Sequence, residues 1–358
     1  MLSLRLGSTV RDAWQAALSF ALGTVALVYA RTFFAEPLLA CVTALALWLT
    51  FSIDPKKIAG AAGMATLAVL AKPTGVLVGP ILTAYLIAKR TVWRIAILPV
   101  CGTAVGFLFY AAYNEMRFGN PLRFGQAWIF DFAAIPSGLA GLVASPGWGL
   151  VWYCPPVILA AWGWRRVARA NRWEAATIAA VFGAFLLLHS FYENWYAGWA
   201  WGPRYLLPAL PGMCALTGLL SGKGRKALLV LTAAGFLVNA PTLFSFYQRH
   251  YNELREQGVT ADRGMAWSFE RAPFLHGWPA AIRVAEDASR MDAKELGAER
   301  TARSQSISES RALRIVAVWW WVLPVAGISR WVGVVVATLM TGLGARMMLK
   351  SAPVESAG

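Results

Sequence analysis

The stretch IAILPVCGTAVGFLFYAAY, residues 95–113, decides the fold class, because it carries no charged side chain over its whole length. A helix needs about 20 predominantly apolar residues to cross the hydrocarbon core of a bilayer. Apolar runs of similar length recur along most of the chain, without the short alternating strands of a membrane barrel. The sequence therefore predicts an all-α, multi-pass transmembrane helical protein, with the lipid bilayer as its first partner.

The composition of the chain argues against a soluble domain. Its 358 residues are 58% hydrophobic and 14% charged, with a mean hydropathy of +0.52, whereas soluble domains carry about 25% charged residues. The net charge of +15 is spread over short basic clusters between apolar runs, and no nucleic-acid-binding signature accompanies it. We therefore expect no nucleic-acid partner and interpret the basic clusters as orientation signals in a membrane.

Ten or eleven spans are expected from the apolar runs. They lie at residues 13–30, 36–53, 58–72, 75–88, 95–113, 148–164, 174–191, 204–220, 226–246, 313–328 and 331–349. The third and fourth are short and are joined through Lys72-Pro73-Thr74-Gly75, where proline ends one helix and favours a turn. This pair forms either a hairpin or one broken helix.

The Lys and Arg residues of the short loops predict the orientation. With the N-terminus in the cytoplasm, fourteen of them between residues 1 and 246 lie on the cytoplasmic side and five on the other. The five are Arg31, Lys72, Arg117, Arg123 and Arg204. Positive charge is retained on the cytoplasmic side of membrane proteins, so we expect a multi-pass protein of the cell inner or plasma membrane with a cytoplasmic N-terminus.

The span pattern divides the chain into four parts. These are a transmembrane domain over residues 1–246, with nine spans and an outer loop at 114–147, a polar extracytoplasmic segment at 247–312, a C-terminal transmembrane hairpin at 313–350, and a tail at 351–358. The outer loop is expected to contain a helix that lies in the membrane interface. No internal repeat is found, which weighs against a transporter built from duplicated halves.

Three charged residues on the predicted outer side are the main candidates for chemistry. Glu36 opens a helix, where the helix dipole favours a carboxylate, and it could instead serve as a metal ligand, a base or a sugar-hydroxyl acceptor. Arg204 follows Pro203 at a predicted helix start, where free backbone N–H groups and a fixed cation suit phosphate. The alternative is an arginine that snorkels within an aromatic belt. Lys72 could add a second cation to the same face.

Other outer-side residues have simpler explanations. Arg117 lies in a Gly- and Pro-containing loop, which suits either a lipid headgroup or an ordinary interfacial turn, and Trp148 precedes a helix that Pro155-Pro156 should bend. His189 is expected to be a packing residue. The four cysteines are expected to be buried small hydrophobic residues, because no Cys/His spacing suggests a metal or a disulfide.

Five motifs, in order along residues 13–245, resemble the GT-C membrane glycosyltransferases, in particular bacterial relatives of the protein O-mannosyltransferases and the lipid A aminoarabinose transferases. They are YARTFFAEP (29–37), GMATLAVLAKPTG (63–75), YNEMRFGNPLRFG (113–125), SPGWGLVWYCPP (145–156) and WYAGWAWGPRYLLPALP (195–211). The last two are the most specific. A GT-C-like fold is therefore expected.

The resemblance implies a polyprenyl-phosphate-linked sugar as donor and an extracytoplasmic lipid, glycan or protein as acceptor, with help from a divalent cation, Mg²⁺ or Mn²⁺. Arg204, Lys72 and Arg117 would bind the donor phosphate, and Glu36 would be the candidate catalytic carboxylate. Trp201, Tyr205 and Trp148 would contact the substrate or its lipid.

The chain departs from this family at its beginning. Members usually start with a further span and an outer loop that carries an Asp as catalytic base, whereas here Asp12 would lie on the cytoplasmic side. We therefore expect an N-terminally incomplete relative that lacks this acidic loop. Two other functions stay open on the sequence: a membrane protein that binds polyprenyl phosphate without catalysis, and, less favoured, a transporter or flippase.

Overall fold

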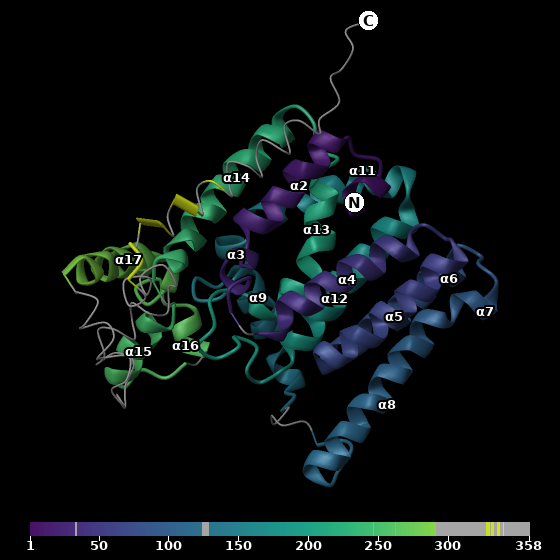
Figure 1. Ribbon diagram of the computed structural model, residues 1–358, viewed down its shortest axis with the longest axis horizontal. Coiled ribbons are helices and arrows are strands. Elements are labelled where there is room, and N and C mark those ends of the chain that lie inside the picture. Colours follow the sequence, from purple (N-terminus) through teal and green to yellow (C-terminus); the bar gives the residue numbers. More distant parts are fainter. Residues whose placement is uncertain are drawn as a thin grey trace, which may run out of the picture.

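The computed structural model describes residues 1–32, 34–123, 129–245, 247–261 and 263–290, with a few positions between 327 and 339. Within these ranges the regular structure is helical, apart from one isolated bridge between Phe130 and Tyr192, so the all-α prediction is confirmed (Figure 1). The expected spans at 313–328 and 331–349 lie almost wholly outside the described residues, and the tail at 351–358 lies entirely outside them.

The helices follow one another with short connections. Up to the outer loop they are α1 (Leu2–Arg5), α2 (Val10–Gly23), α3 (Ala26–Tyr29), α4 (Ala35–Thr50), α5 (Pro55–Ala71), the 3₁₀ helix η1 (Pro73–Leu77), α6 (Val78–Ala88), α7 (Trp93–Ala96) and α8 (Leu98–Phe118). Then come η2 (Phe132–Ala134), α9 (Ile135–Ala144), α10 (Leu150–Tyr153), η3 (Pro155–Leu159), α11 (Ala160–Ala170), α12 (Arg172–Ser190), η4 (Arg204–Ala209), α13 (Leu210–Thr217), α14 (Lys223–Asn239) and η5 (Ala240–Leu243). The last described helices are α15 (Gln248–Glu256), α16 (Arg263–Ala266) and α17 (Pro273–Arg290).

Three described helical stretches are long and apolar enough to cross a membrane, namely Trp93–Phe118, Arg172–Ser190 and Lys223–Leu243. Three more are apolar but shorter, at Ala35–Thr50, Pro73–Ala88 and Phe132–Ala144. The helix expected within the outer loop corresponds to the last of these. The structure therefore contains helices of membrane-spanning character, although not every expected span is one continuous helix.

Several expected spans are broken, and the breaks have local causes. The run 13–30 divides after Gly23, where the Thr24 hydroxyl donates to the Phe20 carbonyl and the backbone becomes extended. The run 148–164 is interrupted at Pro155, as the double proline predicted. The run 204–220 starts as a 3₁₀ helix that contains Pro208, because proline cannot donate to an α-helical ladder.

The helices α4, α5, α6 and α8 lie side by side (Figure 1). α5 and α8 approach most closely, since Gly102 and Gly106 have no side chain and rest against the carbonyls of Ala62 and Thr66. The Thr66 hydroxyl also donates to the Gly102 carbonyl over 2.8 Å. Small residues and hydroxyl groups at a helix contact are the usual means of packing helices within a bilayer.

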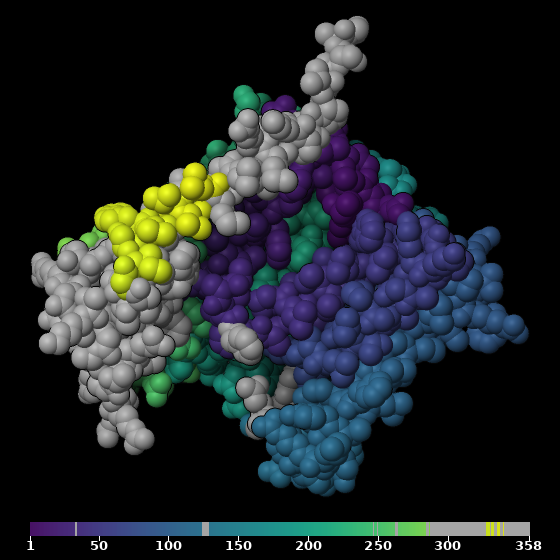
Figure 2. Space-filling view, in the orientation of Figure 1, coloured from purple at the N-terminus to yellow at the C-terminus, as the bar shows by residue number. Residues whose placement is uncertain are grey.

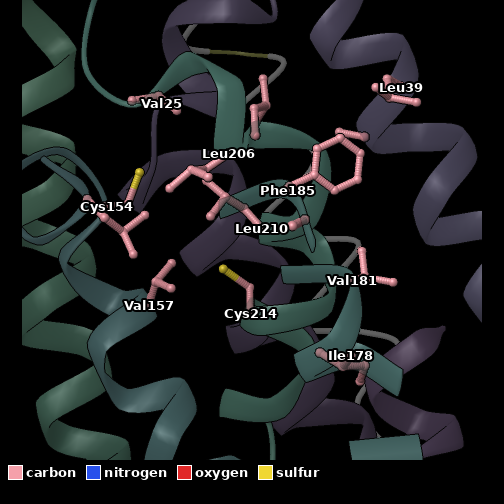
Figure 3. Close-up of a cluster of buried hydrophobic side chains, with 14 of the residues drawn as sticks. Val25, Leu39, Cys154, Val157, Ile178, Val181, Phe185, Leu206, Leu210 and Cys214 are labelled. Atoms are coloured by element: carbon pink, nitrogen blue, oxygen red, sulfur yellow. The ribbon is translucent and has the colours of Figure 1, made fainter. Parts of the chain in front are cut away.

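The buried core lies where α12 meets α13 and the prolines of η3. Figure 3 shows Ile178, Val181, Phe185, Leu206, Leu210, Val157, Cys154 and Cys214 together in this region. The prediction of buried cysteines holds for Cys154 and Cys214 but is wrong for Cys41 and Cys101, which are exposed, Cys41 in the lining of an apolar crevice. Cysteine is a small, weakly polar residue, so hydropathy alone does not decide which of its positions are buried.

The segment after residue 246 is less uniformly polar than predicted. α17 exposes Leu275, Trp278 and Ile282, which lie on one face of the helix at a spacing of three and four residues. The Trp278 indole donates to the Leu237 carbonyl over 2.9 Å, so α17 is fixed against the end of α14. The sequence analysis predicted a uniformly polar segment and overlooked this apolar stripe, because the charged residues of the same helix lower its average hydropathy.

Candidate functional site

Glu36 lies in the first turn of α4 with its side chain only 4% exposed. The positive end of the helix favours a carboxylate there. A carboxylate withdrawn from water also requires a cationic or hydrogen-bonding partner. Two cations from distant parts of the chain meet this need, so the helix dipole alone does not account for the position of Glu36.

Lys72 supplies the first cation. It caps the C-terminus of α5 in an extended conformation, because Pro73 cannot continue the helix and begins η1 instead. This geometry turns the side chain toward α4, where its Nζ lies 2.7 Å from Glu36 Oε1. The turn that the sequence predicted at this junction therefore positions a charged group of the site.

Arg204 supplies the second cation. Its Nε lies 3.3 Å from the same oxygen, Glu36 Oε1, and only 15% of its side chain is exposed. The Nε is buried and forms no hydrogen bond among the described residues, so this contact is electrostatic without hydrogen-bond alignment.

The backbone around Arg204 differs from the sequence prediction. Free N–H groups of a helix N-terminus were expected to form part of an anion site. Instead Gly202 adopts a positive φ of 61°, and the Arg204 N–H donates to the Gly202 carbonyl over 2.9 Å. η4 is a short 3₁₀ helix, so the guanidinium, and not a helix end, provides the positive charge at this position.

Aromatic rings frame the two cations. The Lys72 Nζ lies 4.6 Å from the centre of the Tyr205 ring, and the Arg204 guanidinium lies 4.3 Å from the centre of the Phe34 ring. His189 stacks on Tyr205 with their ring centres 4.5 Å apart, which agrees with its predicted packing role. Rings at these distances attract cations and hold them in place. Tyr205 is thus brought to the site as the sequence predicted.

The two predicted tryptophans lie behind this cluster. Trp148 and Trp201 are buried, and their indoles donate to the Ala200 carbonyl and to Asn239 Oδ1, over 2.8 and 2.9 Å respectively. Asn239 in turn donates to the carbonyls of Tyr153 and Gly235. This geometry favours a supporting role for both indoles over direct contact with a ligand.

The sequence analysis assigned no individual role to two residues that support these tryptophans, Tyr29 and Asn239. Tyr29 is fully buried and donates its hydroxyl to the Trp201 carbonyl over 2.9 Å. Asn239 links Trp201 to the rest of the bundle. An amide within an apolar run is itself a signal, because a polar side chain in a membrane helix is usually functional or hydrogen-bonded across helices.

Arg117 is not part of the cluster. Its described contacts are local: its guanidinium donates to the Tyr113 hydroxyl over 3.1 Å and lies over the Phe118 ring. Figure 1 shows the end of α8, which carries this residue, beyond the ends of α4 and α5. The structure therefore brings Glu36, Lys72 and Arg204 together and leaves Arg117 apart.

An apolar crevice of about 370 Å³ lies in the same part of the fold, and its lining includes Pro37 but not Glu36, Lys72 or Arg204. It runs between α2 and α4 over a floor of α13, and Figure 2 shows it as a hollow between the purple helices with a green floor. Small side chains form most of its walls, and Ala30 and Pro37, the immediate neighbours of Arg31 and Glu36, line one end. Met1 and Leu2 line it as well, at the opposite end of α2 from Ala30.

The described residues do not offer a good site for a divalent cation. Glu36 is the one carboxylate of the cluster, and two cations already share its oxygen. The described part of the chain contains no group of three or more His, Cys, Asp or Glu side chains placed to hold a metal ion. Mg²⁺ and Mn²⁺ prefer several oxygen ligands, so we derive no step through a metal.

Within the described residues, the fold and the site together define a helical protein with three helical stretches long and apolar enough to cross a membrane, and with a buried carboxylate shared by two cations. Comparison with known proteins adds no assignment: no family model, no curated protein and no solved structure matches the chain.

Proposed function

We propose that the chain is a multi-pass protein of the cell inner or plasma membrane, with a cytoplasmic N-terminus. The three long apolar helices support this, as do large side chains such as Leu108, Phe109 and Val230 that face outward from the helices that carry them. The buried carboxylates of the described residues are paired near helix ends, for example Asp12 with Arg225 and Glu174 with Lys89. Transporters usually carry ionisable residues in the middle of their spans, whereas these ion pairs lie at helix ends, so their position weighs against a transporter.

We further propose that it is a GT-C-like glycosyltransferase that binds a polyprenyl-phosphate-linked sugar and transfers the sugar to an extracytoplasmic lipid, glycan or protein. The observation that carries this proposal is the pair of cations, Lys72 and Arg204, that meet at Glu36, whose chain neighbour Pro37 lines the apolar crevice. A phosphate suits two adjacent cations, and a hydrocarbon chain suits the crevice. The five sequence motifs supply the resemblance to this class.

In the proposed reaction the acceptor hydroxyl attacks the anomeric carbon directly. The bond from this carbon to the phosphate oxygen breaks, and the phosphate leaves with the bonding electron pair. Arg204 and Lys72 would stabilise the negative charge that develops on the phosphate oxygen, because fixed charges in a dry site act most strongly on developing charge. The hydroxyl proton would pass to a base, for which Glu36 is the candidate.

A second candidate function is binding of polyprenyl phosphate without transfer. The ion pairs of Glu36 favour it, since Lys72 and Arg204 both lie against Oε1 of the carboxylate that would have to accept the proton. The two functions share the phosphate site and differ only in turnover.

The test measures both properties in membranes that contain the full chain. Radiolabelled polyprenyl-phospho-sugars of several sugar types are added, and bound and transferred label are counted separately. Arg204→Ala should abolish binding, whereas Arg225→Ala, which removes an ion-paired arginine at the other end of α2, should not. Transfer supports the enzyme, and binding without transfer supports the second candidate. Equal binding by the Arg204→Ala variant and the original chain would refute both.

A further inference from the structure

The cluster of Glu36, Lys72 and Arg204 has a net charge of +1. Lys72 and Arg204 each contribute one positive charge, and Glu36 contributes one negative charge. Within the described part of the chain, no further charged side chain is ion-paired with these three. All three are largely withdrawn from water, so their charges are poorly screened.

Glu36 is held firmly in this cluster. Its backbone belongs to the first turn of α4, its side chain is almost completely buried, and both cations lie against one of its oxygens. Moving it out of the site would separate it from Lys72 and Arg204 at once. A ligand phosphate therefore meets the two cations with the carboxylate still beside them.

We infer that Glu36 acts as a charge selector: it makes the site prefer a singly charged phosphodiester over a doubly charged phosphomonoester. This inference rests on the phosphate-binding part of the proposed function. A phosphodiester of charge −1 brings the cluster to zero. A phosphomonoester of charge −2 is attracted about twice as strongly by the net charge of +1, but the cost of withdrawing it from water rises with the square of its charge, about fourfold, and its complex keeps one uncompensated negative charge in a poorly hydrated site.

The selection has a direct consequence for the proposed reaction. The sugar-bearing donor is a phosphodiester, whereas the carrier that remains after transfer is a phosphomonoester. The second ionisation of a phosphomonoester has a pKa of about 6, so the monoester is mostly doubly charged at neutral pH. Breaking the sugar–phosphate bond thus converts the preferred ligand into one that is costlier to withdraw from water. Glu36 would promote release of the spent carrier whether or not it accepts a proton.

The experiment compares two ligands that differ by one methyl group. Dodecyl phosphate and methyl dodecyl phosphate are titrated into the full chain in dodecyl maltoside at pH 8, with inorganic phosphate as a third ligand. We expect the diester to bind about tenfold more tightly than the monoester, because its single charge is less costly to withdraw from water. At pH 5 the monoester carries a single charge, and the difference should shrink. If inorganic phosphate binds as tightly as the diester, the site binds free anions, and the proposed preference for a lipid-linked phosphodiester is wrong.

The variants test the role of Glu36 itself. Glu36→Gln keeps the shape of the side chain and raises the charge of the cluster to +2, so the preference should reverse in favour of the monoester. The double variant Glu36→Gln/Lys72→Gln returns the charge to +1 and should restore the preference for the diester. Glu174→Gln is the matched control, because Glu174 is also buried and paired with a lysine, Lys89, outside this site. It should behave as the original chain does.

The outcomes separate this inference from the proposed function. If Glu36→Gln binds both ligands with the preference of the original chain, the charge selector is wrong and the phosphate site stands. If the original chain binds neither dodecyl ligand, the phosphate site itself is wrong and the inference falls with it. The double variant guards against a folding defect, since its restored preference requires a folded site.

Discussion

Lys72 Nζ lies 2.7 Å from Glu36 Oε1, although 36 positions separate the two residues in sequence. The contact joins the beginning of α4 to the end of α5, so it closes this antiparallel pair of helices at one end. Pro37, next to Glu36, lines the crevice, so the same ion pair also holds the part of α4 that borders it. A single interaction therefore links the packing of two helices to the geometry of the candidate site.

Lys72→Met should destabilise the protein. Breaking a buried ion pair by removing one partner costs about 3–5 kcal/mol, and the remaining interaction of Glu36 with Arg204 should reduce this to about 1–3 kcal/mol. The midpoint of thermal unfolding in detergent, followed by helical circular dichroism, measures the change. Lys57→Met, at an exposed position of the same helix, is the control. The prediction fails if the two variants unfold at the same temperature.

Tyr205→Leu should weaken phosphate binding more than Tyr205→Phe does. The ring of Tyr205 lies under Lys72 and near Arg204, and such contacts contribute about 0.5–2 kcal/mol each. Phenylalanine keeps the ring, whereas leucine removes it, so we expect roughly a three- to thirtyfold loss of affinity for dodecyl phosphate in the leucine variant only. Titration in detergent measures it. Equal losses in both variants would show that the hydroxyl, and not the ring, matters.

Hydropathy and charge were enough to predict much of the fold. Residues 36–53 and 174–191 were expected as spans, and α4 and α12 occupy them almost completely. The breaks were predicted only where proline causes them, as at Pro155. The break at Thr24 depends on a hydroxyl that competes for a carbonyl of the preceding turn, which hydropathy does not register.

The site was only partly predictable, for a related reason. Glu36, Lys72 and Arg204 could be placed on the same side of the membrane, because each lies at the predicted outer end of an expected span. Their direct contact could not be predicted, since it depends on the extended conformation of Lys72 and on the rotation of α4. Arg117 was grouped with them because it lies in one of the five motifs that carry the family resemblance. The extension of α8 to Phe118 carries it away, because the helix continues past the apolar run.

Asn239→Leu should be strongly destabilising. Its side chain bonds to Trp201, to the Tyr153 carbonyl and to the Gly235 carbonyl in a fully buried position. Leucine would leave the Trp201 indole N–H and the Tyr153 carbonyl without these partners, at a cost of about 1–3 kcal/mol for each buried group. The same thermal unfolding assay applies.

A double variant identifies the interaction that is responsible. In Trp201→Phe the indole N–H is absent, so Asn239→Leu should cost less in that background than in the original chain. The difference between the two costs is the coupling energy. A coupling energy near zero would assign the effect of Asn239→Leu to packing alone.

Cysteine labelling should report opposite sides for the two ends of the bundle. In a background with Cys41 and Cys101 replaced by serine, a membrane-impermeant maleimide should label Asn120→Cys and Gln257→Cys in intact cells. Lys57→Cys and Arg169→Cys should be labelled only after lysis. All four positions are exposed, so accessibility and not burial decides the result. Labelling of Lys57→Cys in intact cells would contradict the cytoplasmic N-terminus.

Acidification should loosen α17 from α15. His250 of α15 stacks on His276 of α17 with their ring centres 4.4 Å apart, and its Nε2 lies 3.0 Å from the Arg271 carbonyl oxygen. Burial lowers the pKa of His250 below its ordinary value, and His276 and Arg283 act in the same direction, whereas the Arg271 carbonyl and Glu253 oppose it. The folded segment therefore holds a neutral imidazole.

The sign of the effect follows from proton binding. An unfolded His takes up a proton as the pH falls below about 6.5, while His250 in the packed segment does so only at a lower pH. In that window the unpacked state binds more protons, so the packing of α17 is fully stable above about pH 6.5 and loses stability as the pH falls toward the lowered pKa of His250.

Hydrogen exchange of residues 273–290 at pH 7.5 and 5.5, corrected for the intrinsic exchange rates, measures this loss. His250→Phe keeps an aromatic ring against His276 and should make protection of α17 less dependent on pH. Protection of α12 serves as the internal control and should not change. An unaltered pH dependence in the His250→Phe variant would assign the effect to another group.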